Sequence, residues 1–298
     1  MKVVSVINYK GGVGKTTVTA NLAADMARRG KWVLVIDLDP QTNLTFCFMK
    51  PDEWEKKYAK NQTIKFWFDS IIEGSDATPH FEDLVVTKHG IDILCSHLGL
   101  IDVDLDLAAS LSGGTLKYQR RSYIKTYSYI KKELSHLNGV YDVVLFDCPP
   151  NFSTVTRNAL IASDYYVVPA KMDYLSTLGI NFLEHHVRDL IKEYNQYSDE
   201  LGYPKEHRVN PQFLGVIATM VQYSRNGPIT SIKAQQAELQ RSGFTMFESM
   251  VRENKNFYSD ALETSMPVVL HSPSNSTYIN IVQELSELTT EFMRRVGL

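Results

Sequence analysis

Residues 9–17 read YKGGVGKTT, and this stretch decides the fold class. A β-branched, apolar run at residues 3–7 precedes it, and residues 17–28 carry apolar side chains at helical spacing. The stretch therefore connects a strand to a helix. A glycine-rich loop in this setting exposes backbone N–H groups that bind phosphate oxygens. We predict a phosphate-binding P-loop between the first strand and the first helix.

The side chains of this loop have separate chemical roles. In a P-loop, Lys15 reaches the β and γ phosphate oxygens, and the hydroxyl of Thr16 binds Mg²⁺. Tyr9 stands where the usual first glycine would be, and Lys10 is a second lysine in the loop. The predicted nucleotide cradle consists of Lys10, Gly11, Gly12, Val13, Gly14, Lys15, Thr16 and Thr17.

Four further apolar runs predict the rest of a sheet. They lie at residues 32–36, 143–146, 165–168 and 213–218, with helical stretches between them that include residues 176–194. Continuous apolar strands that alternate with helices are typical of a parallel sheet covered on both faces. We predict the α/β class: a P-loop NTPase with a mostly parallel, twisted sheet flanked by helices on both faces.

Acidic residues follow two of the predicted strands. Asp37 and Asp39 come at the end of the second strand, and Asp147 ends the run at residues 143–146. Because the carboxyl ends of parallel strands meet at one edge of the sheet, these carboxylates are expected near the P-loop. For Asp37 alone, an ordinary capping role at the start of a turn or helix stays open.

Composition sets the limits on domain organisation. The chain has 298 residues, of which 44% are hydrophobic and 22% charged, as in ordinary globular proteins. We expect one domain over residues 1–298, with surface insertions near residues 50–82 and 108–129. Residues 276–296 have the apolar spacing of an amphipathic helix. This helix is expected to pack on the domain, and a membrane-targeting tail is the alternative.

Charge and cysteine content exclude several classes. A net charge of -3 is too low for a protein held on nucleic acid by its overall field, so any DNA contact must be a local basic patch. Cys47, Cys95 and Cys148 are widely spaced, so neither a disulfide framework nor a zinc site is expected. No apolar run reaches the roughly 20 residues that span a bilayer. The first strand begins at residue 3, and we expect a cytoplasmic protein without a signal peptide or an operator-binding extension.

Three motifs resemble the deviant Walker ATPases of the ParA/MinD class. They are YKGGVGKTT with Lys10, DLDPQTN from Asp37, and DCPPN from Asp147, in the order found in that family. The resemblance continues through VVPAKMDYLSTLGI, GVIATM and residues 251–267. It implies an enzyme that binds ATP and Mg²⁺ and hydrolyses ATP.

The resemblance also implies roles for individual residues. Lys10 would cross a dimer interface to the partner's phosphates, so that ATP drives formation of a homodimer. Asp39 would position the attacking water, and Lys10, Lys15 and Asp39 form the catalytic set. Thr16, Asp37 and Asp147 would hold Mg²⁺, the last two through waters. Met220 would contact the adenine; Asn158 either frames the site or makes a local helix bond.

The family has branches that bind nonspecific DNA and branches that bind membranes. The pair Pro40-Gln41 and the YSRNG segment resemble the DNA-partitioning branch. On that likeness, the DNA contacts would be Arg225, Arg252 and Lys255. Charge alone leaves open that these are solvated helix residues, because Glu238, Glu248 and Glu253 are interleaved with them. The basic residues of the tyrosine-rich stretch 117–132 are a secondary candidate surface.

The resulting functional prediction is a ParA-type ATPase. Its ATP-bound sandwich dimer would hold nonspecific nucleoid DNA and release it after hydrolysis stimulated by an adaptor of the ParB type. Such a cycle would segregate or position a plasmid, a chromosome region or another cargo, and the protein would be nucleoid-associated. The alternative is a membrane-associated spatial regulator of the MinD kind.

Overall fold

The computed structural model describes residues 1–298 apart from 76–77, 225–226 and 273–274. Within these described residues, eight strands form one sheet in the order β10-β7-β6-β1-β5-β2-β4-β3. Neighbouring strands are parallel except β3 and β4, which are antiparallel. The strands are β1 (Lys2–Val6), β2 (Val33–Asp37), β3 (Val86–Lys88), β4 (Ile91–Leu94), β5 (Val143–Asp147), β6 (Tyr165–Lys171), β7 (Gln212–Val221) and β10 (Met246–Arg252).

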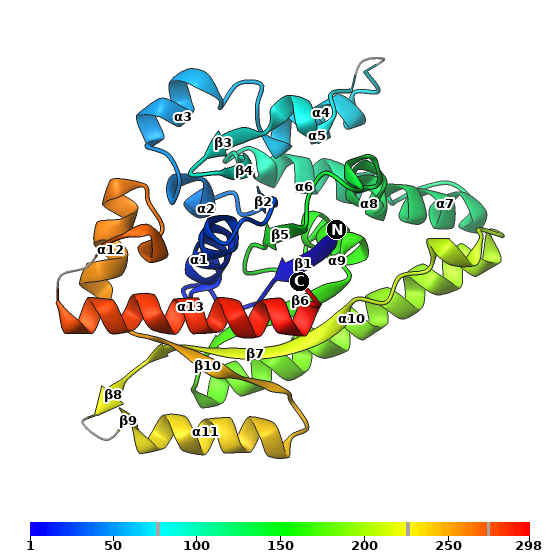
Figure 1. Ribbon diagram of the computed structural model, residues 1–298. Coiled ribbons are helices and arrows are strands. Elements are labelled where there is room, and N and C mark those ends of the chain that lie inside the picture. Colours follow the sequence, from blue (N-terminus) through cyan, green and yellow to red (C-terminus); the bar gives the residue numbers. More distant parts are fainter. Residues whose placement is uncertain (76–77, 225–226, 273–274) are drawn as a thin grey trace.

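Helices cover both faces of this sheet, which confirms the predicted α/β P-loop fold (Figure 1). The longer ones are α1 (Lys15–Arg28), α4 (Ile64–Ile72), α6 (Leu100–Ala109), α7 (Leu116–Tyr127), α9 (Thr154–Ala162), α10 (Tyr174–Glu200), α11 (Thr230–Arg241), α12 (Lys255–Thr264) and α13 (Ser276–Val296). Short helices are α2 (Asn43–Phe46), α3 (Pro51–Lys57), α5 (Phe81–Leu84), α8 (Tyr129–Leu134), η1 (Ser135–Leu137), η2 (Lys205–His207) and η3 (Val268–Leu270). A small hairpin joins β8 (Tyr223–Ser224) and β9 (Gly227–Pro228).

Each face of the sheet has its own apolar core. Side chains of α4, α6, α7, α8, α9 and α10 pack on one face, and those of α1, α12, η3 and α13 pack on the other. The central strand β1 contributes Val3 to the first core and Val4 to the second, as alternate side chains of a strand must. In this sheet the carboxyl ends of β1, β5 and β2 lie side by side, and β6 separates β1 from β7.

The segments expected to be surface insertions also contribute side chains to this core. Trp67 and Phe68 of α4 are fully buried, and the ring of Trp67 packs against that of Phe81. In α7, Ile124 and Tyr127 are buried as well. Their large apolar side chains cover the first face of the sheet. Only parts of residues 50–82 and 108–129 are therefore exposed.

The C-terminal helix α13 is a packed element. Its buried face consists of Ile281, Leu285, Leu288, Phe292 and Val296, which join the second core. Figure 1 shows α13 lying across the molecule beside α1 and β10. The apolar spacing of residues 276–296 is thus explained by burial against the domain. In the described part of the chain, no helix is both long and apolar enough to cross a membrane.

Candidate functional site: a nucleotide cleft at the P-loop

The P-loop runs from the end of β1 into α1 and needs its glycines for backbone conformation. Gly12 and Gly14 have φ angles of 69° and 85°, which other residues adopt only with strain. A Cβ on Gly14 would lie 3.6 Å from the nearest atom of Thr219, an ordinary contact, so φ and not space selects glycine there. The hydroxyl of Thr219, in β7, donates a 2.7 Å hydrogen bond to the carbonyl of Val13. Strand β7, which lies two positions from β1 in the sheet, thus fixes the loop from the side.

A cavity of about 350 Å³ opens beside this loop. It lies between the start of α1, the region after β2, and the segment formed by α12 and η3. Its lining is Gly11, Gly12, Gly14, Lys15, Thr16, Thr17, Ala20, Asn21, Asp39, Asn43, Cys47, Pro150, Met220, Tyr258, Ala261, Leu262, Met266, Pro267 and Val268. Most of the predicted nucleotide residues therefore surround one hollow.

Asp147 accepts hydrogen bonds from two threonine hydroxyls at the start of α1, where the P-loop ends. The Thr16 Oγ1 donates to Asp147 Oδ2 at 2.6 Å, and the Thr19 Oγ1 donates to Asp147 Oδ1 at 3.3 Å. Burial raises the pKa of Asp147 to about 7, against the opposing effect of the Thr16 hydrogen bond and the Lys15 ammonium. A buried carboxylate beside a threonine hydroxyl is an oxygen-rich place for a hard divalent cation.

The two other predicted acids occupy different positions. Asp37 is fully buried and paired in register with Asp147 on the neighbouring strand. Its Oδ2 accepts hydrogen bonds from the backbone N–H and the hydroxyl of Thr45, at 2.8 and 2.7 Å. These hydrogen bonds cap the first turn of α2, which is the ordinary capping role that the sequence left open for Asp37. Asp39 instead lines the cavity, and its Oδ1 accepts from the backbone N–H of Gln41 at 2.9 Å.

The two P-loop lysines have contrasting surroundings. Lys15 is buried, and its Nζ donates to the carbonyls of Asn8 and Lys10, at 3.2 and 3.3 Å. Burial lowers the pKa of Lys15, while the nearby carboxylates of Asp147 and Asp39 oppose that effect. Lys10 is more exposed and points the other way. The ammonium of Lys10 lies 2.7 Å from Asp173 Oδ2, at the N-terminus of α10.

The wall opposite the P-loop comes from the C-terminal part of the chain, where Met220 was the one residue predicted from the sequence to contact the nucleotide. Asn21 of α1 accepts a 3.0 Å hydrogen bond from the backbone N–H of Val269, which joins α1 to η3. Met220, a predicted contact, lines the cavity with a φ of 52°, and Tyr258 lines it from α12. The Tyr258 hydroxyl is buried and has no hydrogen-bond partner in the described part of the chain. Met220 and Tyr258 lie in the two stretches, GVIATM and residues 251–267, through which the family resemblance continues, whereas Asn21 lies in none of the named stretches.

Asn158 makes one hydrogen bond within its own helix and one to a neighbouring helix. Its side chain is fully buried, donates to the carbonyl of Thr154 at 3.2 Å, and accepts from the backbone N–H of Ile130 at 3.5 Å. It therefore joins α9 to α8 and does not line the cavity. The local alternative named from the sequence describes this asparagine.

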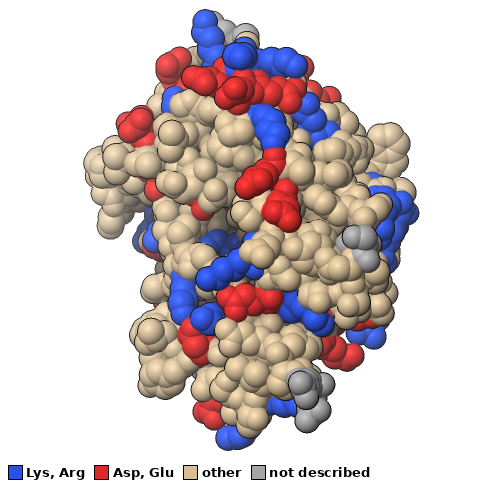
Figure 2. Space-filling view, turned by 90° about the vertical axis from the view of Figure 1, so that its left-hand side faces the viewer, with Lys and Arg blue, Asp and Glu red and all other residues tan. Residues whose placement is uncertain are grey.

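Of the three residues predicted to contact DNA, the structure describes two. Arg225 lies outside the described residues. Arg252 binds both carboxylate oxygens of Glu284 through its Nε at 3.0 Å, and its guanidinium stacks over Tyr223 with 4.3 Å to the ring centroid. Lys255 is exposed at the first position of α12. In Figure 2, which views this side of the molecule, lysine and arginine side chains are interspersed with acidic ones.

Comparisons with known proteins match both the site and the fold. The profile of a family described as an AAA domain matches residues 1–199. The sporulation initiation inhibitor Soj of Bacillus subtilis is 25% identical over 288 residues, which cover 96% of this chain and 98% of Soj. The chromosome partitioning protein ParA of Caulobacter vibrioides is 26% identical over 96% of this chain and 94% of its own length.

Solved structures share the architecture at lower identity. Apo McdA of Cyanothece is 20% identical with a TM-score of 0.66, covering 98% of this chain and 99% of that chain. Cobyrinic acid a,c-diamide synthase of Mycobacterium smegmatis, with a bound ATP analogue and magnesium, is 22% identical with a TM-score of 0.68. The aligned region covers 99% of this chain and 94% of the synthase. These likenesses show that the fold is common to proteins of different activity.

Proposed function

The chain belongs to the AAA domain family as a P-loop ATPase of the ParA/MinD type, and from this premise we propose that it is an ATP-driven positioning protein. The observation that carries the proposal is the cavity at the P-loop, where Lys15, Thr16 and Asp39 face one hollow. The similarity to the chromosome partitioning protein ParA over nearly the whole chain supports the same function.

The residues present fit ATP and Mg²⁺. The backbone N–H groups of residues 11–17 and the Lys15 ammonium would hold the phosphates, and Met220 would lie against the adenine. Thr16 and Asp147 offer oxygen ligands, and Asp37 lies opposite Asp147 on the next strand, where it would bind the ion through water. Bound ATP supplies the phosphoryl group, and Mg²⁺ neutralises charge on its oxygens. The raised pKa of Asp147 reflects a buried carboxylate that a cation would stabilise in its charged form.

Asp39 is the residue best placed to act on water. It lines the cavity at 8% exposure, whereas Asp37 and Asp147 are held by threonine hydroxyls. A carboxylate at the edge of a phosphate site orients an attacking water through a hydrogen bond, and phosphoryl transfer depends on such positioning. The proposed reaction is hydrolysis of ATP to ADP and phosphate.

An ATP-bound homodimer is the proposed active state. Lys10 is directed away from its own cavity, so its phosphate-binding role would be exerted on a partner subunit. The first turns of α10, beside Lys10, expose Tyr174 and Leu175 at 68% each and Phe182 at 61%. Apolar side chains gathered beside a site are typical of a surface covered by another protein. A second subunit whose Lys10 approaches this cavity would cover them.

Nonspecific DNA is the proposed ligand of that dimer. Arg252 stacks on Tyr223 of the β8–β9 hairpin, and Lys255 begins α12 three residues later. Two copies of this surface in a dimer would double its positive charge. Because Glu284 already neutralises Arg252, Lys255 and Arg225 are the stronger candidates for contact with phosphates. Adaptor-stimulated hydrolysis would end the DNA-bound state. An adaptor of the ParB type and a cytoplasmic, nucleoid-associated location belong to the same proposal.

The membrane-binding alternative has less support, because the apolar face of α13 is buried against α1 and β10. A co-sedimentation assay separates the two functions. The protein with ATP and Mg²⁺ is mixed either with DNA fragments of unrelated sequence or with anionic liposomes. ATP-dependent binding to DNA is expected. Binding to liposomes without binding to DNA would replace the partition function by the membrane function.

A further inference from the structure

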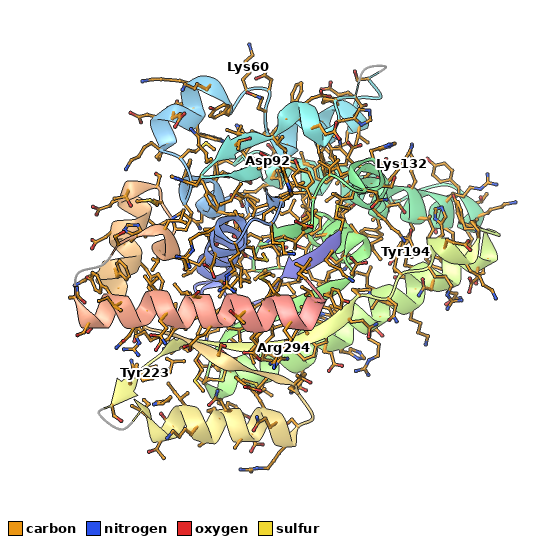
Figure 3. The ribbon with its side chains drawn as sticks, in the orientation of Figure 1. Lys60, Asp92, Lys132, Tyr194, Tyr223 and Arg294 are labelled. Carbon is orange, nitrogen blue, oxygen red and sulfur yellow. The ribbon has the colours of Figure 1, made fainter. Side chains whose placement is uncertain are left out.

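Two histidines and a glutamate meet at a position remote in sequence from the P-loop motifs. His80 directly precedes α5, Glu133 is on α8, and His136 is in η1. Each offers one ligand atom, and these atoms all lie within 4.8 Å of one another. Lys132, which neighbours Glu133 and is labelled in Figure 3, marks this part of the molecule. None of the three residues lines the nucleotide cavity.

The distances are close to those of a metal centre. His80 Nδ1 and Glu133 Oε1 are 3.0 Å apart, and the rings of His80 and His136 have their centroids 5.2 Å apart. Two ligands on one tetrahedral zinc ion lie about 3.3 Å apart, given bonds of about 2.0 Å. Two ligand atoms are therefore nearly in place. A side-chain rotation of His136, which is exposed, would bring in the third.

The ligands are held in position by the fold. Glu133 is nearly buried, at 8% exposure, and its Oε1 also accepts a 3.0 Å hydrogen bond from the backbone N–H of Phe81. The backbone N–H of His80 donates to Asp83 Oδ2 at 2.9 Å, which fixes the loop at the start of α5. Glu133 and His136 have the i, i+3 spacing that places two ligands on one turn of helix. The site therefore needs little ordering when an ion binds.

We propose that His80, Glu133 and His136 form a binding site for a divalent transition metal ion, with zinc as the best match. Two imidazoles and one carboxylate are a ligand set that zinc adopts, with a water in the fourth position. Imidazole nitrogen favours zinc, nickel or copper over Mg²⁺, which prefers oxygen ligands. No zinc site was expected from the sequence, because the cysteines are widely spaced. That argument does not apply to this cluster, which contains no cysteine.

The bound ion would link two segments that are far apart in sequence. One is the loop before α5, and the other is the α8–η1 turn, which leads to β5 and its final residue Asp147. An ion that binds the folded protein and not the unfolded chain stabilises the fold by mass action. Zinc is therefore expected to raise the melting temperature.

Isothermal titration of the chelator-treated, full-length protein with zinc chloride tests the proposal. Excess Mg²⁺ is present to occupy the separate carboxylate site of the P-loop. One equivalent of zinc is expected to bind. His80→Ala and His136→Ala should each lower the affinity by at least about tenfold, since second-shell changes alone already cost that much. His185→Ala, which removes an exposed histidine paired with Asp189 on α10, is the matched control and should leave the affinity unchanged.

A second measurement guards against misfolded variants. Zinc should raise the melting temperature of the wild type and of the His185 variant, and leave that of the His80 and His136 variants unchanged. His136 is exposed, so His136→Ala should have the melting temperature of the wild type without zinc. His80→Ala also loses the hydrogen bond to Glu133, so this variant is compared only with itself, with and without zinc. A wild-type protein that takes up no zinc would overturn the site. So would His80 and His136 variants that bind zinc as tightly as the wild type.

Discussion

The Nζ of Lys10 and a carboxylate oxygen of Asp173 lie 2.7 Å apart, which joins the P-loop to the N-terminus of α10. The two side chains are 39% and 33% exposed, so water screens the pair only in part. Ser176 Oγ adds a 3.5 Å contact to the same ammonium. The proposed dimer requires Lys10 to bind phosphates of a partner subunit. The ion pair therefore competes with dimer formation.

Asp173→Asn is expected to favour the ATP-dependent dimer. Asp173 Oδ1 also caps α10 by accepting from the backbone N–H of Ser176 at 2.8 Å, and asparagine keeps that capping bond. The substitution therefore removes only the negative charge at residue 173 that pairs with Lys10. Partly exposed pairs contribute about 1 kcal/mol or less each, and a dimer contains two of them, so the dimer dissociation constant should fall by up to about 30-fold.

Analytical ultracentrifugation with ATP and Mg²⁺ measures this constant. Asp189→Asn, farther along α10 and paired with His185, serves as the control and should leave the dimer unchanged. A weaker dimer for Asp173→Asn would mean that Asp173 contributes to the interface, and the competition described above would be wrong.

The two P-loop lysines should have separable defects. Lys15→Ala is expected to abolish ATP binding, because the buried ammonium lies at the phosphate cradle and a charge-assisted hydrogen bond contributes about 1.5–3 kcal/mol. Lys10→Ala should bind ATP normally and stay monomeric. Fluorescent ATP-analogue binding and size-exclusion chromatography measure the two properties. Normal dimerisation of the Lys10 variant would contradict the cross-subunit role.

Asp39→Ala should bind ATP, dimerise and hydrolyse ATP slowly. Removing the only cavity-lining carboxylate among the described residues removes water positioning but leaves the phosphate cradle intact. A loss of roughly 100-fold in turnover is expected, the lower end of the range for a positioned acid or base. Phosphate release under single-turnover conditions is the measurement. Turnover equal to that of the wild type would assign the role to another residue.

The central part of the fold could be predicted because its strands are buried on both faces. Such strands read as continuous apolar runs, and the predicted run at residues 143–146 became β5 (Val143–Asp147). Strands β3, β4 and β10 were not predicted, because their apolar runs are short or interrupted by polar side chains. Local pattern is weakest for such short or interrupted runs.

The candidate site was predictable in part for a similar reason. Phosphate binding by the P-loop depends on consecutive backbone groups, so its residues are adjacent in sequence and form a motif. Asp173, Asn21 and Tyr258 belong to the site through contacts that span long stretches of chain, such as Asn21 with Val269. Arg252 looked like a free cation, and only the fold brings Glu284 beside it.

Magnesium binding should depend on pH through Asp147. Burial raises the pKa of this carboxyl to about 7, and Mg²⁺ binds only the charged form. As the pH falls below about 7, protons compete with the ion, and the Mg²⁺ affinity of the ATP complex should fall by up to about tenfold per pH unit. Above pH 7 it should level off.

Titration of Mg²⁺ at pH 6, 7 and 8 checks this dependence in the wild type and in Asp147→Asn. The variant should bind Mg²⁺ weakly at every pH, and subtracting its profile removes the effect of protons on ATP itself. Parallel profiles for the two proteins would show that Asp147 does not titrate in this range.

DNA binding should require ATP, ignore sequence and fall steeply with salt, because each neutralised phosphate releases condensed counterions. Lys255→Glu and Arg225→Glu should weaken binding to all sequences equally while ATP-dependent dimerisation persists. Both copies of a dimer lose the contact, so each variant should reduce the slope of log affinity against log salt by about 2. Electrophoretic mobility shift across a salt series measures this slope.

The matched control for these variants is Lys60→Glu, a charge reversal at the end of the molecule opposite Tyr223 and the β8–β9 hairpin (Figure 3). It changes the net charge of the chain by the same amount as Lys255→Glu. If overall charge governed DNA binding, the two reversals would weaken it equally; if α12 meets the phosphates, only Lys255→Glu reduces the slope. Arg252→Ala should have a smaller effect than Lys255→Glu, because Glu284 already holds the guanidinium. An Arg252 effect larger than that of Lys255 would mean that the ion pair opens on DNA.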